Sequence, residues 1–360
     1  MKRRHFLTHT AGALAAGAIL PSSLRAQAAP AAAAPSGRLA EFLPAQVPGA
    51  VVKPGEFVFA AAHFDHGHIN GQCSALVAAG GTLKWMYEPD EAKHAAFRRR
   101  YPDVKVARSL DEILADPEVK LVTAAAVASE RGPIGCRVME AGKDYFTDKT
   151  PFTTLAQLEQ ARAVAARTGR KYMVYFSERL HVESAMFATD LVASGAIGRI
   201  VQVVGLGPHR LGKAGRPAWF FEKEKYGGIL CDIGSHQFEQ FLTYAGATDA
   251  TVTSAAVGNF ANPDKPELED FGEATLVGNN GATNMIRVDW FTPAGLSTWG
   301  DGRTFILGTQ GYLELRKYVD VARGQRGNQV FLVDDKGEHH LDVSGKVGHR
   351  FFGEFILDCL

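Results

Sequence analysis

A lysine, an aspartate and a histidine stand at positions where they could move a proton to or from an alcohol. Lys149 lies in the segment Asp148-Lys149-Thr150-Pro151, directly after a stretch that we expect to be a strand, residues 144–147. A lysine at the carboxyl edge of a parallel sheet can hold a substrate hydroxyl and shift its proton as the carbon loses hydride. The alternative is a solvated lysine in a turn set by Pro151.

Asp232 and His236 belong to a glycine-rich run, residues 227–236, that reads GGILCDIGSH. Because they are four residues apart, they share a face if the run is helical. Ser235 is a plausible helix cap, which would put His236 in the first turn. A histidine oriented by a carboxylate is a natural general base for an alcohol. The alternative is a capping Asp232 and a core His236, but the glycines favour a site because they allow close approach.

The loop after the first expected strand, residues 57–62, is where a dinucleotide-binding fold carries Gly-x-Gly-x-x-Gly. Here Ala62 and Phe64 replace the first two glycines, and Gly67 stands as the third. We expect Ala62, Phe64, Gly67 and His68 to lie against the diphosphate of a cofactor. Phe64 and Asp65 would crowd that group, so the loop is either rerouted or its binding of a dinucleotide is weakened or lost.

Further cofactor contacts are expected at the ends of two other strands. Glu88 ends a strand at 82–87 and fits the acidic residue that binds the adenosine ribose and favours NAD over NADP. A turn residue before Pro89 is an equally good interpretation. Asp148 and Lys149 lie at the edge where a nicotinamide ring would be held.

The same loop holds four residues that could ligate a divalent metal ion such as zinc: His63, Asp65, His66 and His68. Neighbouring residues of an extended chain point to opposite faces, so at most two or three could converge. A polar loop with hydrogen-bonded histidines is the alternative. For substrate contacts we single out His209 and Arg210 at an expected strand end, and Trp219 as a face for stacking a sugar, although core packing also suits a tryptophan.

The elements that must position these groups fall into two domains. Strands and helices alternate over residues 51–177, which predicts a doubly wound parallel sheet, the Rossmann arrangement. Over residues 178–345 strand-like segments dominate, which predicts an α+β domain on an open, mostly antiparallel sheet. Residues 346–360 show one apolar helical face. The chain stops within that pattern, so we expect the helix to continue beyond it.

The first 28 residues have the pattern of an export signal. Lys2, Arg3 and Arg4 precede an apolar stretch of ten residues, and Ala26-Gln27-Ala28 is a small-residue cleavage site. The Arg3-Arg4 pair predicts the twin-arginine route and a periplasmic or exported location; ten apolar residues are too few for a membrane anchor. An uncleaved amphipathic start is the alternative. Because that route carries folded proteins, a tightly held cofactor is expected. Residues 29–50, rich in Ala and Pro, predict a linker.

Composition excludes several classes of protein. The 39 Lys and Arg balance the 39 Asp and Glu, so a general basic surface for nucleic acid is not expected. No Cys-x-x-Cys pair is present, which argues against a zinc ribbon and leaves any pairing of the four cysteines open.

Four runs in the same order resemble the glucose–fructose oxidoreductase and inositol dehydrogenase family, Gfo/Idh/MocA. Residues 148–151 are similar to its Glu-Lys-Pro element, with Asp for Glu and the proline displaced by one, and residues 227–236 to its Asp-x-Gly-x-His run. The runs 195–200 and 308–315 resemble its later elements. The resemblance implies a Rossmann domain, an open sheet that helps to form homo-oligomers, and hydride transfer between NAD or NADP and a sugar or polyol carbon.

By position, the resemblance implies that Lys149 polarises the reacting hydroxyl and that His236 takes its proton. It implies that Asp232 orients the substrate and His236. An exported member with retained nucleotide would regenerate it with a second sugar. The altered loop leaves three alternatives open: a lyase or glycosidase with internal redox cycling, a metal-assisted enzyme, and a non-catalytic carbohydrate-binding protein.

Overall fold

The computed structural model describes residues 37–360. The predicted export signal, residues 1–28, and the first part of the predicted linker lie outside these residues. The rest of the predicted linker includes helix α1 (Gly37–Ala40), whose Leu39 is fully buried in the core of the second sheet domain. Every helix within residues 37–360 is too short or too polar to cross a bilayer.

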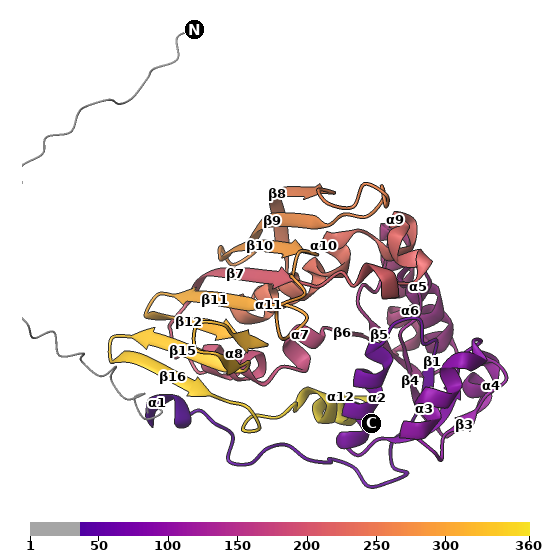
Figure 1. Cartoon of the computed structure of the whole chain (residues 1–360). Helices are drawn as coiled ribbons and strands as arrows, with labels where there is room; N and C mark the ends of the chain where they lie inside the picture. The colour runs from indigo at the N-terminus through magenta and orange to yellow at the C-terminus, as the bar shows by residue number, and fades with distance from the viewer. Residues whose placement is uncertain (1–36) are drawn as a thin grey trace, which may run out of the picture. The chain divides into compact units, whose positions relative to one another are not determined.

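A six-stranded parallel sheet forms the first domain and confirms the predicted Rossmann arrangement (Figure 1). Its strands in spatial order are β3 (Lys105–Val106), β2 (Thr82–Tyr87), β1 (Val58–Ala62), β4 (Val119–Ala124), β5 (Asp144–Asp148) and β6 (Tyr172–Tyr175). Side chains along β1 alternate between two apolar clusters: Phe59 and Ala61 face one, Ala60 and Ala62 the other. Both faces are therefore covered, which is why β1 is a continuous apolar run.

Helices cover both faces of this sheet. The first cluster takes side chains from α2 (His68–Ala78), α3 (His94–Arg100) and the C-terminal α12 (Phe351–Cys359). The second takes them from α4 (Leu110–Ala115), α5 (Ala128–Glu140) and α6 (Leu155–Thr168). Phe352, Phe355 and Ile356 of α12 are buried beside α2, so the end of the chain returns to the first domain (Figure 1).

An eight-stranded sheet forms the second domain. Its spatial order is β16 (Gly337–Asp342), β15 (Gln329–Asp334), β12 (Gly311–Arg316), β11 (Arg303–Gly308), β7 (Ile200–Pro208), β10 (Thr283–Asp289), β9 (Phe271–Gly278) and β8 (Ala250–Gly258). Only β7 and β10 pair in parallel, which confirms the predicted, mostly antiparallel sheet. A separate pair of short strands joins β13 (Val319–Asp320) to β14 (Gln325–Arg326).

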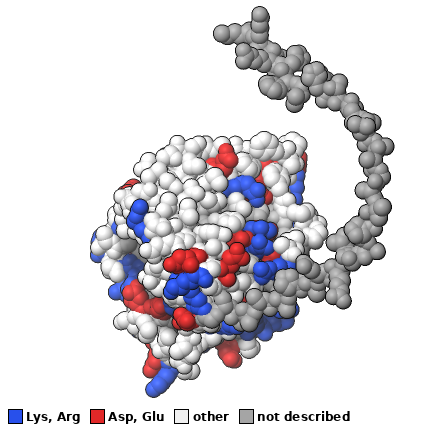
Figure 2. All heavy atoms as spheres, turned by 90° about the vertical axis from the view of Figure 1, so that its left-hand side faces the viewer, with Lys and Arg blue, Asp and Glu red and all other residues white. Residues whose placement is uncertain are grey.

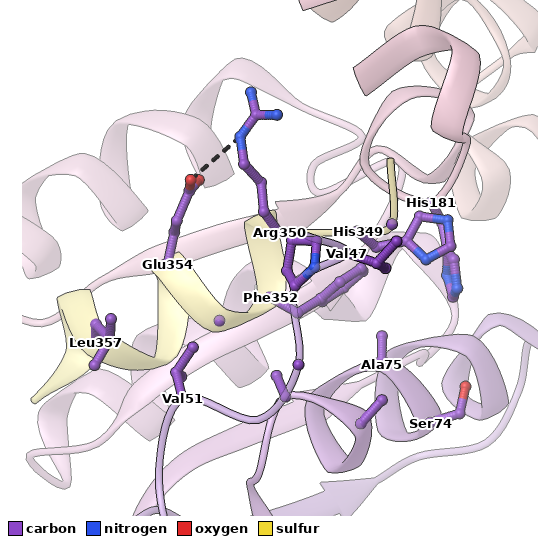
Figure 3. A pocket seen from close by; sticks show the side chains of 16 residues that line it. Val47, Val51, Ser74, Ala75, His181, His349, Arg350, Phe352, Glu354 and Leu357 are labelled. Atoms are coloured by element: carbon purple, nitrogen blue, oxygen red, sulfur yellow. Dashed lines mark ion pairs between the residues drawn. The ribbon is translucent and has the colours of Figure 1, made fainter. Parts of the chain in front are cut away.

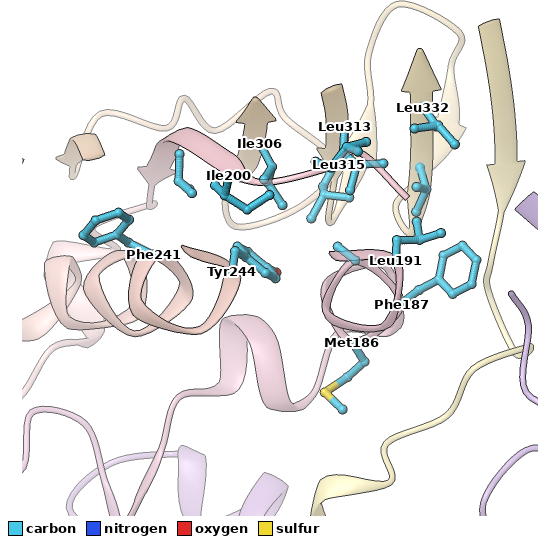
Figure 4. Close-up of a cluster of buried hydrophobic side chains, with 14 of the residues drawn as sticks. Met186, Phe187, Leu191, Ile200, Phe241, Tyr244, Ile306, Leu313, Leu315 and Leu332 are labelled. Atoms are coloured by element: carbon cyan, nitrogen blue, oxygen red, sulfur yellow. The ribbon is translucent and has the colours of Figure 1, made fainter. Parts of the chain in front are cut away.

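One face of the second sheet packs on two helices, α8 (Glu183–Ala193) and α11 (Gly234–Ala245). Figure 4 shows Phe187 and Leu191 of α8 and Phe241 of α11 facing inward-pointing strand residues such as Ile306 and Leu313. The opposite face leaves Met285, Phe305 and Leu307 exposed. Burial therefore alternates along the strands, as it does in a sheet with one open face. Figure 2 shows the side of the molecule that lies on the left in Figure 1. Basic and acidic side chains are interspersed on this side.

Short helices complete the chain: α7 (Ser177–Leu180), α9 (Lys223–Tyr226) and α10 (Ile229–Asp232), with 3-10 turns η1 (Glu91–Lys93), η2 (Lys213–Gly215) and η3 (Ala218–Phe221). Helix α2 begins at His68, and Gly67 before it provides no side-chain cap that would mark this start in the sequence. The elements that sequence patterns missed are short ones, such as β3, α9 and α10, in which too few residues reveal a period.

Candidate functional site

Asp148 ends β5 and is the anchor of the candidate site. Its side chain is fully buried, and it accepts the backbone N–H of Lys149 at 2.7 Å and the guanidinium Nη2 of Arg131 at 3.2 Å. The ring Nδ1 atoms of His68 and His66 lie 2.7 and 2.9 Å from its two oxygens. Burial alone would raise the pKa of this carboxyl, but His68, Arg131 and His66 hold it well below its ordinary value.

The contacts with Asp148 also orient the rings of His66 and His68. An ionised carboxylate only accepts hydrogen bonds, so a ring nitrogen that bonds it acts as the donor. Burial, with the neighbouring His68, lowers the pKa of His66 to about 4 in spite of Asp148. His66 is therefore a neutral imidazole at neutral pH.

Lys149 links the two sheet domains through Asp232, the last residue of α10. Its Nζ lies 2.5 Å from Asp232 Oδ1, and both side chains are buried. The hydroxyl of Thr150 donates to the carbonyl of Cys231 next to this pair. Burial opposes ionisation of Asp232, but the ammonium of Lys149 lowers the pKa of the carboxyl. Asp232 Oδ2 is buried and has no hydrogen-bond partner in the described part of the chain.

His236 lies in the first turn of α11, one turn beyond Asp232, and is 1 % exposed. Its Nδ1 has no partner among the described residues. Burial, assisted by the charge of Lys149, lowers the pKa of His236 to about 3 although Glu178 opposes this, so the ring is neutral. Ser235 was predicted to cap the helix, and this is wrong: α11 begins at Gly234 after Ile233, and the Ser235 hydroxyl donates to the carbonyl of Asp232.

Gly227 and Gly228 of this run have a role in the path of the backbone. Gly227 and Gly228 adopt φ of 86° and 88°, a region that favours glycine. A Cβ on Gly228 would lie 2.6 Å from Oε2 of Glu269, and that same oxygen accepts the backbone N–H of Ile229 at 2.9 Å. The two glycines thus turn the chain so that Glu269 can bond the start of α10, which carries Asp232.

A cavity of about 200 Å³ opens between the two domains at Lys149 and His236. Ten residues line it: His66, His68, Lys149, Ser177, Glu178, His209, Arg210, Arg216, His236 and Trp299. The predicted substrate contacts His209 and Arg210 are among them, whereas Trp219 is not and packs beside Phe220. Burial lowers the pKa of His209 to about 4, despite Glu178 nearby. The cavity is smaller than the roughly 300–1,000 Å³ of sites for drug-sized ligands, so it suits a small molecule.

Sequence reasoning missed Glu178, which lines the same cavity as Lys149. It is 2 % exposed and accepts Lys317 Nζ at 2.6 Å and Gln237 Nε2 at 2.9 Å. Lys317 holds the pKa of this carboxyl well below its ordinary value, although burial opposes that shift. A usable signal was present, because Glu178 closely follows β6 and polar residues after parallel strands converge at one edge.

The loop after β1 is open to a ligand, contrary to the expectation of crowding. Phe64 turns into the core against Phe97, with ring centroids 4.5 Å apart, and Lys93 Nζ lies 3.2 Å from Asp65. A Cβ on Gly67, at the start of α2, would meet nothing within 4 Å. In the first turn of α2, the N–H groups of Ile69 and Asn70 bond the carbonyls of His66 and Gly67 at 3.4 and 3.2 Å. Ala62 ends β1 in the core, and His68 is the first residue of α2.

Glu88 is engaged within the protein. Its carboxylate accepts the backbone N–H of Phe64 at 2.5 Å and that of Asp90 at 2.9 Å, and it is buried. It thus ties the loop after β1 to the end of β2. Glu88 therefore has a structural role, because it holds the loop after β1 in place.

The four predicted metal ligands do not come together. His66 and His68 meet at Asp148, with one ligand atom of each residue within 4.8 Å of the others. His63, with φ of 54°, packs its ring against Tyr87, and Asp65 pairs with Lys93. An ion at the His66–His68–Asp148 group would have to share the carboxylate with Arg131.

A larger cavity of about 440 Å³ lies elsewhere, between residues 47–51, α2 and α12 (Figure 3). Its wall carries His181, His349 and the ion pair of Arg350 with Glu354. Lys149 and His236 line the smaller cavity and not this one, so the smaller cavity is the candidate active site.

Two family models match the chain. Residues 60–176 match the model described as "Oxidoreductase family, NAD-binding Rossmann fold", and residues 186–314 match "GFO/IDH/MocA C-terminal domain". The two segments correspond to the two sheet domains of the structure.

Known proteins of similar sequence are oxidoreductases. The uncharacterized oxidoreductase YhhX of Escherichia coli strain K12 is 31% identical over 196 residues, which span 53% of this chain and 54% of that protein. D-xylose dehydrogenase of Paenarthrobacter nicotinovorans is 26% identical over 152 residues, 41% of this chain and 39% of that protein. The chain thus matches about half of the length of these curated relatives.

Solved structures extend the likeness to most of the chain. A candidate oxidoreductase from Erwinia carotovora atroseptica SCRI1043 has 47% identity and a TM-score of 0.82, with coverage of 84% of this chain and 91% of that one. Levoglucosan dehydrogenase in complex with NADH and levoglucosan has the same fold at 18% identity and a TM-score of 0.67, covering 79% and 80% of the two chains.

Proposed function

Because the chain belongs to the Gfo/Idh/MocA family of oxidoreductases, we propose that it transfers hydride between NAD or NADP and a carbon of a sugar or polyol. The observation that carries the proposal is the ion pair of Lys149 with Asp232, which sets an ammonium group beside the neutral ring of His236 on the wall of one cavity. An ammonium donor and a neutral imidazole are the two groups needed to polarise and deprotonate an alcohol.

The residues present fit a nicotinamide dinucleotide. Open space at Gly67, at the start of α2, suits a diphosphate, and Phe64 leaves that space free. Asp148, Lys149, His66 and His68 would border the nicotinamide end at the carboxyl edge of the sheet. When bound, the nicotinamide supplies the acceptor or donor of hydride.

The protein's own groups would manage the proton. Asp232 fixes the Lys149 ammonium, whose remaining N–H groups can donate to the substrate oxygen and stabilise negative charge that develops there. His236 is unprotonated at neutral pH and can accept the hydroxyl proton.

Analysis of nucleotide and substrate tests this proposal. One sample of the purified, folded protein is denatured, and the small molecules that it releases are separated. NAD and NADP are titrated into a second sample that stays folded, and reduction of the nucleotide is followed with a panel of sugars and polyols. We expect nucleotide to bind and at least one substrate to reduce it. Failure to retain or bind either nucleotide would contradict the proposal.

A second candidate, a sugar–sugar oxidoreductase with retained nucleotide, is favoured by the Arg3-Arg4 pair and the periplasmic location that it predicts. Such an enzyme would release no free reduced nucleotide, and oxidation of one sugar would depend on a second sugar. We also propose that the chain forms a homo-oligomer through the open face of its second sheet, where apolar side chains such as Phe305 and Leu307 are exposed.

A further inference from the structure

Arg216 is a rigidly held cation on the wall of the candidate active site. Its Nε donates to the carbonyl of Leu211 at 2.9 Å. Its guanidinium carbon lies 4.4 Å from the ring centroid of Phe220 and 4.8 Å from that of Trp290. One backbone bond and two aromatic rings thus fix the group, so little side-chain entropy remains to be lost when a ligand binds its outer nitrogens.

The other cations at this cavity already have partners of one kind or another: the two lysines pair with carboxylates and Arg210 bonds backbone carbonyls. Lys149 pairs with Asp232, and Lys317, behind the wall, pairs with Glu178. Arg210 uses one nitrogen to bond the carbonyls of Leu296 and Thr298 at 2.6 and 2.8 Å, which makes it a support for that loop.

Arg216 differs from the two lysines, because the described residues place no carboxylate within ion-pair distance of it. Arg210 also has no carboxylate partner among the described residues, but backbone carbonyls engage its guanidinium. It is nevertheless partly buried, and burial lowers the pKa of its guanidinium. Asp232 is near enough for the guanidinium to lower the pKa of the carboxyl, yet no ion pair forms between them. A desolvated charge without a counter-ion costs free energy, and an anion from the ligand would remove that cost.

The histidines on this wall carry no negative charge that could balance the guanidinium of Arg216. His66, His209 and His236 line the same wall, and burial keeps all three unprotonated near neutral pH. The uncompensated charge of this wall is therefore positive. It lies at Arg210 and Arg216, and Arg210 is already engaged by backbone carbonyls.

We infer that Arg216 binds an anionic substituent of the substrate, a carboxylate or a phosphate, so that the enzyme acts on sugar acids or sugar phosphates in preference to neutral sugars. A planar guanidinium matches either group through two parallel N–H···O bonds. The inference rests on the proposed function of this cavity and names its substrate class. Because the cavity is about 200 Å³, a monosaccharide-sized anion suits it better than a longer chain.

Matched pairs of ligands test the inference by binding alone, without catalysis. Titration calorimetry on the full chain saturated with nucleotide would compare glucose, galactose and mannose with their uronates, with glucose 6-phosphate as a separate arm. We expect at least one anionic sugar to bind tenfold or more tightly than its neutral partner. The uronate and phosphate arms identify which anion is preferred. Equal or tighter binding of every neutral partner would overturn the inference.

Variants then assign the preference to Arg216. Arg216→Gln should remove at least tenfold of the preference for the anion and leave the affinity for the neutral partner within about threefold, whereas Arg216→Lys should keep part of the preference. Lys213→Gln is the matched control, because it removes a positive charge from the same loop at a residue that pairs with Asp264 outside the cavity. A preference that survives Arg216→Gln in folded protein would overturn the assignment.

The outcome separates this inference from the proposed function. If sugar acids bind through Arg216 but no hydride reaches the nucleotide, the oxidoreductase proposal fails and the anion site stands. If neutral sugars are oxidised and Arg216→Gln changes nothing, the oxidoreductase proposal stands and the anion site fails.

Discussion

Lys149 Nζ lies 2.5 Å from Asp232 Oδ1, although 83 positions separate the two residues in the chain. Lys149 follows β5 of the parallel sheet, and Asp232 ends α10 beside the antiparallel one. The pair therefore both joins the two domains and sets the chemical groups of the cavity between them. A buried pair of this kind leaves an uncompensated charge when one partner is removed, so activity and stability respond together.

Replacement of Lys149 tests the catalytic role of this pair. Lys149→Met should lower kcat by about 10²–10⁴-fold, because the substrate oxygen loses its charged donor. Nucleotide affinity should change much less than kcat. The measurement is the initial rate of nicotinamide reduction, with Lys120→Met, an exposed lysine on β4, as the control. Near wild-type kcat in Lys149→Met would rule out this role.

Buried neutral histidines should make the protein less stable in mild acid. At pH 5 the unfolded chain binds a proton at His236 that the folded chain does not, because the folded pKa is about 3 and the unfolded value about 6.5. The stabilising effect is full above pH 6.5 and is lost as pH falls toward the folded pKa. For His236 alone, the free energy of unfolding should decrease by about 2 kcal/mol between pH 7 and pH 5.

Urea unfolding at several pH values measures this slope. His66 and His209, each with a pKa lowered to about 4, should add to it in the same direction. His236→Asn should flatten the dependence between pH 5 and 7, since the variant no longer gains a proton on unfolding. An unchanged slope in this variant would show that His236 is already accessible to protons in the folded protein.

The direction of Phe64 can be tested by its removal. Phe64→Ala should lower the free energy of unfolding by about 3–5 kcal/mol, because the side chain is 8 % exposed and packs on Phe97. The affinity for nucleotide should not rise. Phe260→Ala, at a phenylalanine that is 75 % exposed, is the control. Tighter nucleotide binding by a stable Phe64→Ala variant would mean that the ring does crowd the diphosphate.

Glu178 should be essential for stability because it neutralises the buried ammonium of Lys317. Glu178→Ala should cost about 3–5 kcal/mol, since Lys317 would keep its charge without a partner. Glu118→Ala removes an exposed partner of Lys84 and should cost no more than about 1 kcal/mol. Equal effects of the two substitutions on urea unfolding would contradict a buried, coupled pair.

Metal removal separates hydride transfer from the metal-assisted alternative. Both oxygens of Asp148 are engaged by Arg131, His66 and His68, so we expect a metal content well below one equivalent and no loss of activity with a chelator. Elemental analysis of the purified protein measures this directly. A stoichiometric divalent ion that is lost in His66→Ala plus His68→Ala would favour the metal-assisted alternative.

Part of the site was predictable from sequence, because residues that follow parallel strands gather at one edge of the sheet. Lys149 follows a strand, and His236 lies in the first turn of a helix after a glycine turn, so local patterns locate both residues. The family resemblance predicts that they converge. The direction of Phe64 was not predictable, because packing on Phe97 from another helix decides it. The position of the Arg216 side chain was not predictable for the same reason. Its loop has no periodic pattern, and Phe220 and Trp290 from other segments hold its guanidinium.

Transfer of deuterium tests the central claim most directly. The protein is mixed with one equivalent of oxidised nucleotide and with a substrate from the panel that carries deuterium on the carbon to be oxidised, and the nucleotide is analysed by mass spectrometry after a single turnover. Reduced nucleotide that contains one deuterium is the expected result, and Lys149→Met and His236→Asn should slow its appearance. Unlabelled, still oxidised nucleotide, despite demonstrated binding of both ligands and consumption of the sugar, would contradict the account.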